Sequence, residues 1–486
     1  MSTKSIKMNM IFNLIRTVSG IVFPLISFPY TSRILGPHGT GWMNFAISFA
    51  GYFTMFATIG IPAIGIRAIA QARDDQEELS ARAQELFLMH LGASLFAFVV
   101  YLSVVFLRPD LNQEALLFTI TGVSILLSML GVDWIYQGLE EYRYIAVRSV
   151  VFSTLSLVSL FVFVHDPDDY VICAGISVAS SLGSSVLNFY TARRHLLRPR
   201  TRPWNFRRHL RPMGSSWALN LVSSLYLSLD TVMLGFLSKP ENVGYYAAAS
   251  RFFTLTWAMI ASFGTTLLPR LSYYSETGNE DGFRVMIGKS FAMTFMLCVP
   301  AIFALMLLSH DIILVFAGDK FLPAVACLNI TVPGLFFASV ANILAWQILF
   351  PKKQESKVLR AASIAAVVSV ASNLILIRMY AHVGAAISKV VSEIVVTIAL
   401  YFLARRVCVF DMFPWKTIRF YLLAAFAMLG ALVLVRLAVP VGLFRLAVSV
   451  PVGVAVYFGV LVLLKDELAE VAVGAMRKKM GLAPRS

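Results

Sequence analysis

The segment RRHLLRPRTRPWNFRRHLRP, residues 193–212, contains eight arginines and three prolines and interrupts an otherwise nearly continuous series of apolar segments. No other interval of this length is as rich in arginine. We interpret residues 193–212 as a linker between two related lobes, because the apolar segments before and after it can be superimposed as an internal repeat. Basic clusters also bind nucleic acid, but here apolar segments flank the cluster and no nucleic-acid-binding module surrounds it. We therefore expect no nucleic-acid partner.

The composition of the chain predicts a membrane protein. Of its 486 residues, 58% are hydrophobic and 14% are charged, whereas soluble domains average roughly 45–50% apolar and 25% charged residues. A hydrocarbon core of about 30 Å requires helices of about 20 apolar residues, whose backbone hydrogen bonds are satisfied internally. The sequence therefore predicts an all-α polytopic membrane protein.

Apolar windows of sufficient length predict about fourteen transmembrane helices. The first six precede the linker, the next six follow it, and the last two fall outside the repeat. The predicted spans are residues 9–30, 42–64, 86–107, 115–137, 146–164, 170–191, 213–236, 244–268, 290–309, 322–349, 358–377, 382–404, 418–439 and 442–464. Pro24, Pro29, Pro300 and Pro333 lie inside spans, where each removes one backbone hydrogen bond and permits a bend.

Basic residues collect in alternate connections between the predicted spans. Arg67, Arg73 and Arg82 lie in the second connection, whereas the loop at residues 165–170 has no basic residue apart from histidine. Such an alternation is the positive-inside pattern of multi-pass membrane proteins. It accounts for the net charge of +15 and places the linker and both termini in the cytoplasm.

The internal repeat defines the domain organisation. We expect an N-lobe at 1–192, the linker at 193–212, a C-lobe at 213–404, and two further spans with a cytoplasmic tail at 405–486. An even number of spans in each lobe relates the lobes by an axis along the membrane normal. The matching positions are Leu35-Gly36, Gly41-Trp42 and Ala46 in the first half, and Leu234-Gly235, Gly244-Tyr245 and Ala249 in the second.

The sequence contains no complete signature of an enzyme, a metal site or a cofactor site. The four cysteines have no metal-like spacing. The segment from Gly282 to Ser290 resembles a P-loop but is one residue too long and opens an apolar span. We expect no catalytic residue, metal or cofactor. Coupling to a proton or sodium gradient stays open.

A few ionisable residues lie inside the predicted spans, where each costs about 2.5–3.5 kcal/mol at the centre of a helix. Asp230 and Arg251 lie at similar depths in the seventh and eighth spans and could pair. Lys389 and Glu393 share one face of the twelfth. One interpretation is two structural ion pairs, with Arg16 reaching the cytoplasmic interface. The other is a cationic cavity in which Arg16, Arg251 and Lys389 bind the substrate.

Several segments closely resemble the bacterial polysaccharide flippases of the Wzx type. The resemblance covers nearly the whole chain and extends to a superfamily that includes multidrug and toxin extruders and the lipid II flippase. It is carried by FPYTSRILGPHGTGWMNFA at 28–46, IGIPAIGIRAIAQ at 59–71, DWIYQGLEEYRYIAVRS at 133–149, LDTVMLGF at 229–236, VGYYAAASRF at 243–252 and LLPRLS at 267–272.

The resemblance implies a V-shaped pair of six-helix lobes and a cargo of polyprenyl-pyrophosphate-linked oligosaccharide. Such a cargo moves from the cytoplasmic to the periplasmic leaflet by alternating access, for O-antigen, capsule or exopolysaccharide synthesis. The membrane lipid and this glycan are the expected partners, with a polysaccharide polymerase complex as a further one. In the superfamily basic residues line the central cavity, and Arg16 and Arg251 occupy helices where such residues are expected.

Two other functions stay open from the sequence. A small-molecule, ion-coupled antiporter belongs to the same superfamily. A membrane polymerase or ligase acting on lipid-linked sugars would be an enzyme, but such proteins usually have a sizeable external loop, and all predicted external loops here are short.

Overall fold

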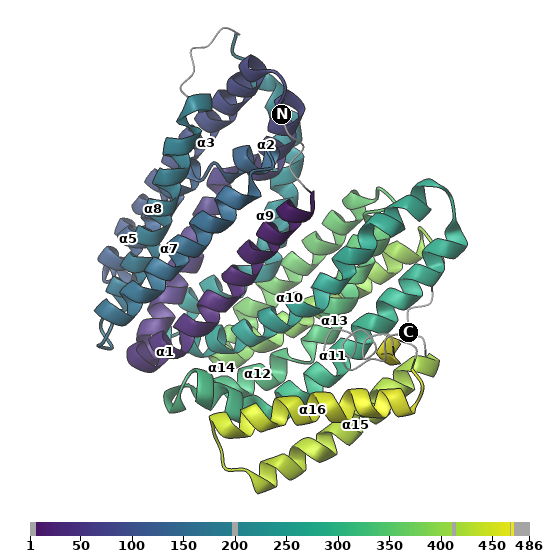
Figure 1. The fold of residues 1–486 in the computed structure, drawn as a ribbon. Coiled ribbons are helices and arrows are strands. Elements are labelled where there is room, and N and C mark those ends of the chain that lie inside the picture. Colours follow the sequence, from purple (N-terminus) through teal and green to yellow (C-terminus); the bar gives the residue numbers. More distant parts are fainter. Residues whose placement is uncertain (1–5, 197–202, 411–414, 467, 471–486) are drawn as a thin grey trace. The chain divides into compact units, whose positions relative to one another are not determined.

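The computed structural model describes residues 6–196, 203–410, 415–466 and 468–470, and every regular element in these ranges is a helix (Figure 1). The centre of the linker and the basic residues of the predicted C-terminal tail, such as Arg477, lie outside the described residues. The chain forms two compact units, residues 1–244 and residues 245–486.

The first unit contains nine helices among the residues described. The long helices pack along one another, and the short ones join them. In chain order they are α1 (Ile6–Thr58), α2 (Ile61–Ala72), α3 (Gln76–Leu107), α4 (Pro109–Asn112), α5 (Ala115–Leu130), α6 (Asp133–Gly138), α7 (Tyr142–Phe163), α8 (Tyr170–Leu196) and α9 (Arg207–Leu237).

Helix α10 (Pro240–Glu276) starts in the first unit and continues into the second. The second unit then contains two long helices, α11 (Glu280–Phe316) and α14 (Glu355–Arg405), and a broken segment between them. The broken segment consists of a 3₁₀ turn η1 (Asp319–Phe321), α12 (Ala324–Thr331), α13 (Gly334–Asn342) and a π-helix η2 (Ile343–Leu349). The helices α15 (Trp415–Ala438) and α16 (Leu443–Leu463) complete it.

Nine helices of the described chain are long and apolar enough to cross a membrane, or up to eleven if each of two bent pairs is one span. Two of the nine each contain the residues of two predicted spans, because α1 and α14 run through residues with non-helical backbone angles. The predicted fold class, an all-α polytopic membrane protein, is confirmed. The count of fourteen spans stays a prediction.

The break in α1 occurs at Gly36, whose φ of 64° and ψ of −176° are open to glycine but strained for other residues. It coincides with the turn that the sequence predicts between the first two spans. The break in α14 occurs at Ala381, with a φ of 47°, again between two predicted spans.

The prolines differ in their effect. Pro333 stands between α12 and α13, and the helical segments on its two sides are bent by 43°. Pro24 and Pro29 lie within α1, and Pro300 lies within α11, with no helix end at any of the three. A proline in a membrane helix therefore permits a bend without fixing one.

Two glycines allow the backbones of α1 and α10 to touch within the first unit. A Cβ atom at Gly41 would collide with the carbonyl oxygen of Pro240, and one at Gly244 would collide with that of Pro37. Beside them, Nδ1 of His38 lies 3.0 Å from Oε1 of Glu241. The repeat in the sequence matches Gly41 with Gly244, so the two glycines hold equivalent places in a reciprocal contact.

Aromatic side chains fill the space between α1, α3, α5 and α9. The ring of Phe45 lies 5.5 Å from that of Phe118, and the ring of Phe49 lies 5.3 Å from Tyr101 and 5.5 Å from Phe236. The buried Tyr101 hydroxyl donates a 2.8 Å hydrogen bond to the carbonyl of Phe118. This packing fixes the helices that carry the charged residues of the first unit.

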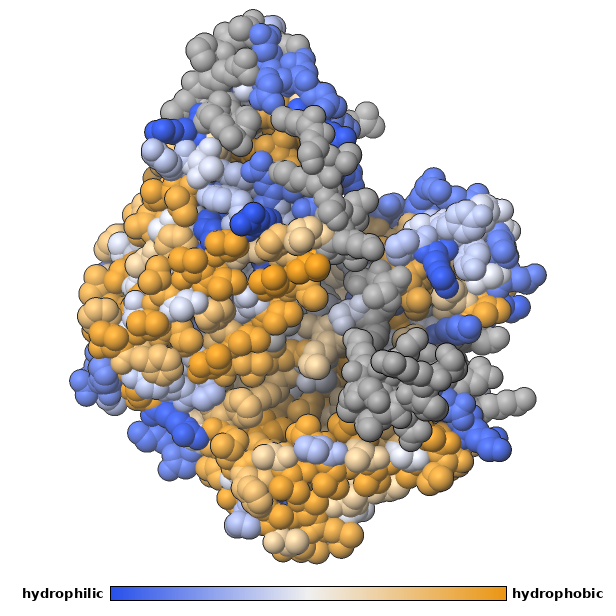
Figure 2. Space-filling model, viewed as in Figure 1, coloured by the Kyte–Doolittle hydropathy of each residue, from blue (hydrophilic) through white to orange (hydrophobic). Residues whose placement is uncertain are grey.

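The surface has the hydropathy of a membrane protein. Figure 2 shows a broad apolar band on the visible face of the first unit, with hydrophilic residues toward both of its ends, and an apolar face on α15 and α16. Large apolar side chains are exposed along α7, among them Val151, Leu155, Val158 and Phe163. Exposed apolar side chains of this kind are favourable against lipid chains and unfavourable in water.

Candidate functional site

A cluster of charged residues in the first unit centres on Asp133, the first residue of α6. Its Oδ1 atom accepts hydrogen bonds from Nη2 of Arg148 at 2.5 Å and from Nδ2 of Asn188 at 2.8 Å. Its Oδ2 atom lies 3.9 Å from Nη2 of Arg16. Helices α1, α6, α7 and α8 thus each supply one polar side chain to the cluster.

The chain places Asp133 where helix α5 gives way to α6. Helix α5 ends at Leu130, Gly131 and Val132 interrupt the helical backbone, and α6 begins at Asp133. A carboxylate at the start of a helix is stabilised by the free backbone N–H groups there. The hydrogen bond from Arg148 holds the Asp133 side chain toward α7.

Arg148 is buried, with 7% of its surface exposed, and its guanidinium also lies 5.4 Å from the ring centre of Tyr144. Within the described part of the chain, its Nε and Nη1 atoms have no hydrogen-bond partner. Two guanidinium groups, Arg16 and Arg148, and the Asp133 carboxylate leave the cluster with one net positive charge. Its electrostatics favour a further anion.

Arg16 is among the site residues predicted from the sequence, whereas Asp133 and Arg148 are not. Both lie near the ends of predicted spans, at residues 115–137 and 146–164, where the cost of a charge falls and the signal weakens. The only other sign of them was the segment DWIYQGLEEYRYIAVRS, which begins with Asp133 and contains Arg148.

A second charged group lies in the second unit. Nζ of Lys389 is 3.2 Å from Oε1 of Glu393, one turn later on α14, and both side chains are buried. The Lys389 ammonium also lies 5.9 Å from the ring centre of Phe253 on α10. Arg251 precedes Phe253 by two residues on that helix. The contact with Phe253 brings this part of α10 next to α14.

Two predicted arrangements join residues of both units and stay predictions. Asp230 is buried on α9 in the first unit, whereas its predicted partner Arg251 belongs to the second. The predicted substrate site likewise combines Arg16 of the first unit with Arg251 and Lys389 of the second.

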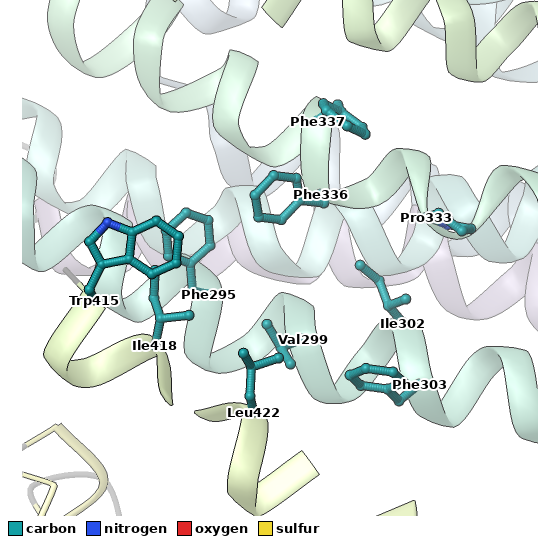
Figure 3. Close-up of a pocket in the computed structure, with 10 residues that line it drawn as sticks. All are labelled: Phe295, Val299, Ile302, Phe303, Pro333, Phe336, Phe337, Trp415, Ile418 and Leu422. Carbon is teal, nitrogen blue, oxygen red and sulfur yellow. The ribbon is translucent and has the colours of Figure 1, made fainter. Parts of the chain in front are cut away.

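An apolar pocket of about 410 Å³ lies between α11, α13 and α15 of the second unit (Figure 3). Phe295 and Phe336 stack at its wall with ring centres 5.4 Å apart, and Trp415 lines one of its ends. All ten lining residues are apolar or aromatic. Such a pocket suits a hydrocarbon chain.

Among the described residues, no group of three or more His, Cys, Asp or Glu side chains could hold a metal ion. The four cysteines are free thiols, and all except Cys408 are buried.

Comparison with known proteins identifies the family of the chain. The family described as "Polysaccharide biosynthesis protein" matches residues 6–275, and the MatE family matches residues 217–375. A protein of Escherichia coli (strain K12) named as an O-antigen transporter is 25% identical over 410 residues, which cover 83% of this chain and 97% of that protein. A Haloferax volcanii protein named as a low-salt glycan biosynthesis flippase, Agl15, is 26% identical over 37% of this chain and 39% of its own length.

Two solved structures share the fold. The lipid II flippase MurJ in an inward closed conformation matches with a TM-score of 0.74 at 18% identity, covering 94% of this chain and 99% of that one. An inward-facing multidrug resistance MATE family transporter matches with a TM-score of 0.62 at 14% identity, over 79% of this chain and 97% of that one. The resemblance found in the sequence motifs is confirmed. Because the family match spans more than half of its length, this chain belongs to the polysaccharide biosynthesis protein family.

Proposed function

We propose that the protein is a flippase for polyprenyl-pyrophosphate-linked oligosaccharide repeat units. It moves them from the cytoplasmic to the periplasmic leaflet of the bacterial inner membrane. The observation that carries the proposal is the family membership together with relatives that are named for O-antigen transport and glycan flipping. The same names support a transporter rather than an enzyme, and they favour a flippase over a drug antiporter or a polymerase.

The charges and the pocket give this function a physical basis. A pyrophosphate needs cations to offset the loss of its hydration in a membrane. Arg16 and Arg148 in the first unit, and Lys389 in the second, are cations within membrane helices. The lipid tail needs an apolar surface, which the pocket beside Phe295 and Phe336 supplies.

The finer parts of the proposal concern topology and the site. Both termini and the linker are cytoplasmic, and the lobes comprise residues 1–192 and 213–404. Arg16, Arg251 and Lys389 bind the pyrophosphate, while Asp230 and Glu393 offset part of their charge in the empty protein. A polysaccharide polymerase complex is the partner that would receive the exported repeat unit.

Transport by purified protein in lipid vesicles tests the proposal. We expect the vesicles to move a pyrophosphate-linked glycan across the bilayer, but neither the free oligosaccharide nor a cationic drug. Alanine at Arg16, Arg251 and Lys389 together should abolish this transport. Arg16→Lys should be impaired less than Arg16→Ala, because lysine keeps the charge but loses the planar fork that fits phosphate oxygens.

Either of two experimental outcomes would contradict the proposal. Exchange of a cationic drug for protons or sodium, with no glycan movement, would identify an antiporter. Unchanged glycan transport by the triple alanine variant would show that the three cations do not bind the cargo.

A further inference from the structure

Glu85, on α3, has a fully buried carboxylate that binds residues in the C-terminal part of the arginine-rich linker. Its Oε1 atom accepts the backbone N–H of Asn205 at 2.8 Å. Its Oε2 atom accepts Nε of Arg208 at 2.8 Å and Nη2 of Arg208 at 2.7 Å, and it lies 2.9 Å from Nε2 of His209. Hydrogen bonds between charged groups are the strong ones. Residues 205–209 are therefore fixed to α3.

A second carboxylate on α3 extends this contact. Oε1 of Glu78 accepts Nη1 of Arg208 at 2.6 Å and Nε of Arg82 at 2.7 Å. Arg82 in turn donates to the carbonyl of Ala68 at 3.1 Å. The network leaves little freedom to rotate the segment about its own axis, so the direction of the neighbouring side chains is set.

The side chains that do not meet Glu85 lie on the surface. Trp204, Phe206 and Leu210 are 50%, 37% and 56% exposed. The rings of Trp204 and Phe206 stack with centres 5.3 Å apart and planes 7° apart. Arg207 is exposed between them and Leu210. Exposed aromatic rings next to arginine are typical of segments that lie in a membrane interface.

The position of Glu85 along α3 sets the depth of the segment. The apolar part of α3 begins directly after it, at residue 86. Helix α3 has 32 residues, so it is about 48 Å long, whereas the hydrocarbon core is about 30 Å thick. Its polar N-terminal part therefore projects beyond the core, and the residues bonded to Glu85 lie at the level of the lipid headgroups.

The end of α8 supports this level. The apolar stretch of α8 ends at Arg193, and the Arg193 guanidinium lies 4.0 Å from the ring centre of the exposed Tyr190. An aromatic ring and an arginine thus mark the boundary on α8 as well. The linker starts and ends in the same layer.

We propose that residues 203–210 form an interfacial anchor, in which Trp204, Phe206 and Leu210 insert among lipid headgroups and Arg207 binds anionic phospholipid. The charge of the segment selects this partner, because residues 193–212 contain eight arginines and no acidic residue. Glu85 is the positioning residue that turns the apolar side chains toward the lipid. The anchor concerns how the linker meets the membrane and does not depend on which cargo is moved.

Lipid contact can be measured on the full chain in nanodiscs. A single cysteine in place of Phe206 carries a bimane fluorophore, and Cys408→Ser removes the one native thiol that is not buried. Thr277, in the exposed turn between α10 and α11, provides a control label. We expect lipids brominated in the upper acyl chain to quench the label at residue 206 more than the label at residue 277. The quenching should grow with the fraction of phosphatidylglycerol.

Two variants test the parts of the proposal. Arg207→Gln should raise the phosphatidylglycerol fraction needed for half-maximal quenching by about fivefold, the worth of one arginine at an anionic surface. Arg360→Gln, which removes an exposed arginine of α14, should leave it unchanged. Glu85→Gln should reduce the quenching at residue 206, because the amide offers a weaker acceptor to Arg208.

Specific outcomes would overturn the anchor. Equal lipid quenching at residues 206 and 277 would exclude membrane contact, and this comparison does not require any charge variant to fold. Equal quenching in phosphatidylcholine and phosphatidylglycerol would exclude anionic headgroups. A label at residue 206 that is shielded from aqueous iodide but not reached by brominated lipid would indicate a protein partner instead.

Discussion

Asp133 joins side chains from three other helices, and its single carboxylate faces two arginines. Such a residue serves two purposes. It offsets the cost of placing Arg148 in a buried position, and it leaves Arg16 with a weaker partner at 3.9 Å. A cation with a weak partner is available to an anionic cargo, while a buried one with a strong partner holds the geometry.

This difference predicts the stability of variants. Asp133→Asn leaves the buried Arg148 without its counter-charge, which we expect to cost about 3–5 kcal/mol. Arg148→Met combined with Asp133→Asn should recover part of the loss, because the unpaired charge is gone. The measurement is thermal unfolding of the purified protein in detergent.

The exposed pair Arg108–Asp110 is a matched control, since its side chains are 55% and 76% exposed at 3.6 Å. Asp110→Asn should change stability by less than about 1 kcal/mol. Strict additivity of the two changes at Asp133 and Arg148 would show that the pair contributes nothing by its interaction.

At the scale of the helices, hydropathy predicts most of the elements and the turns at Gly36 and Ala381. It does so because both the length and the apolar character of a span follow from the thickness of the bilayer. Bends are less predictable, because neighbouring helices decide whether a proline kinks its helix. Pro333 breaks a helix and Pro300 does not, although both are prolines in apolar surroundings.

The docking of the linker on α3 should depend on pH through His209. Its pKa is held below the usual 6.5 by burial, while the hydrogen bond to Glu85 acts in the opposite direction. The nearby charges are those of Glu85 and Arg82 on α3 and Arg208 on α9. As the pH falls below about 6.5, an undocked His209 takes up a proton before the docked one does. The docked state therefore loses stability toward acid pH and keeps it above pH 6.5.

His209→Gln should flatten this dependence, because glutamine keeps an N–H donor for Glu85 and does not titrate. The measurement is the accessibility to iodide of a fluorophore at residue 206, followed between about pH 5 and pH 8. If iodide accessibility has the same pH profile in the wild-type protein and in the His209→Gln variant, the pH dependence belongs to another group.

At the scale of the whole molecule, the sequence indicates how deep each charged residue lies in the membrane. It does not indicate on which face of its helix the residue lies. Helices that are apolar on all sides give no rotational signal. For this reason the contact between Arg16 and Asp133 could not be predicted from the sequence. The family follows from segments spread along the chain, so it is the most securely predicted property.

The charge of the proposed site predicts how transport responds to the membrane potential. With the cell interior negative, each uncompensated negative charge that moves outward gains about 2.3 kcal/mol per 100 mV. If Arg16, Arg251 and Lys389 move with the pyrophosphate, their charge cancels most of this gain, and the loaded step should depend only weakly on potential. The return of the empty, positively charged site should depend on it more strongly.

Vesicles with a potential imposed by a potassium gradient separate the two steps, since single-turnover transport reports the loaded step and repeated turnover includes the return. Lys389→Gln removes one positive charge, so it should lower the voltage dependence of the return step and raise that of single-turnover transport. A steep voltage dependence of single-turnover transport would mean that the cargo crosses without these cations.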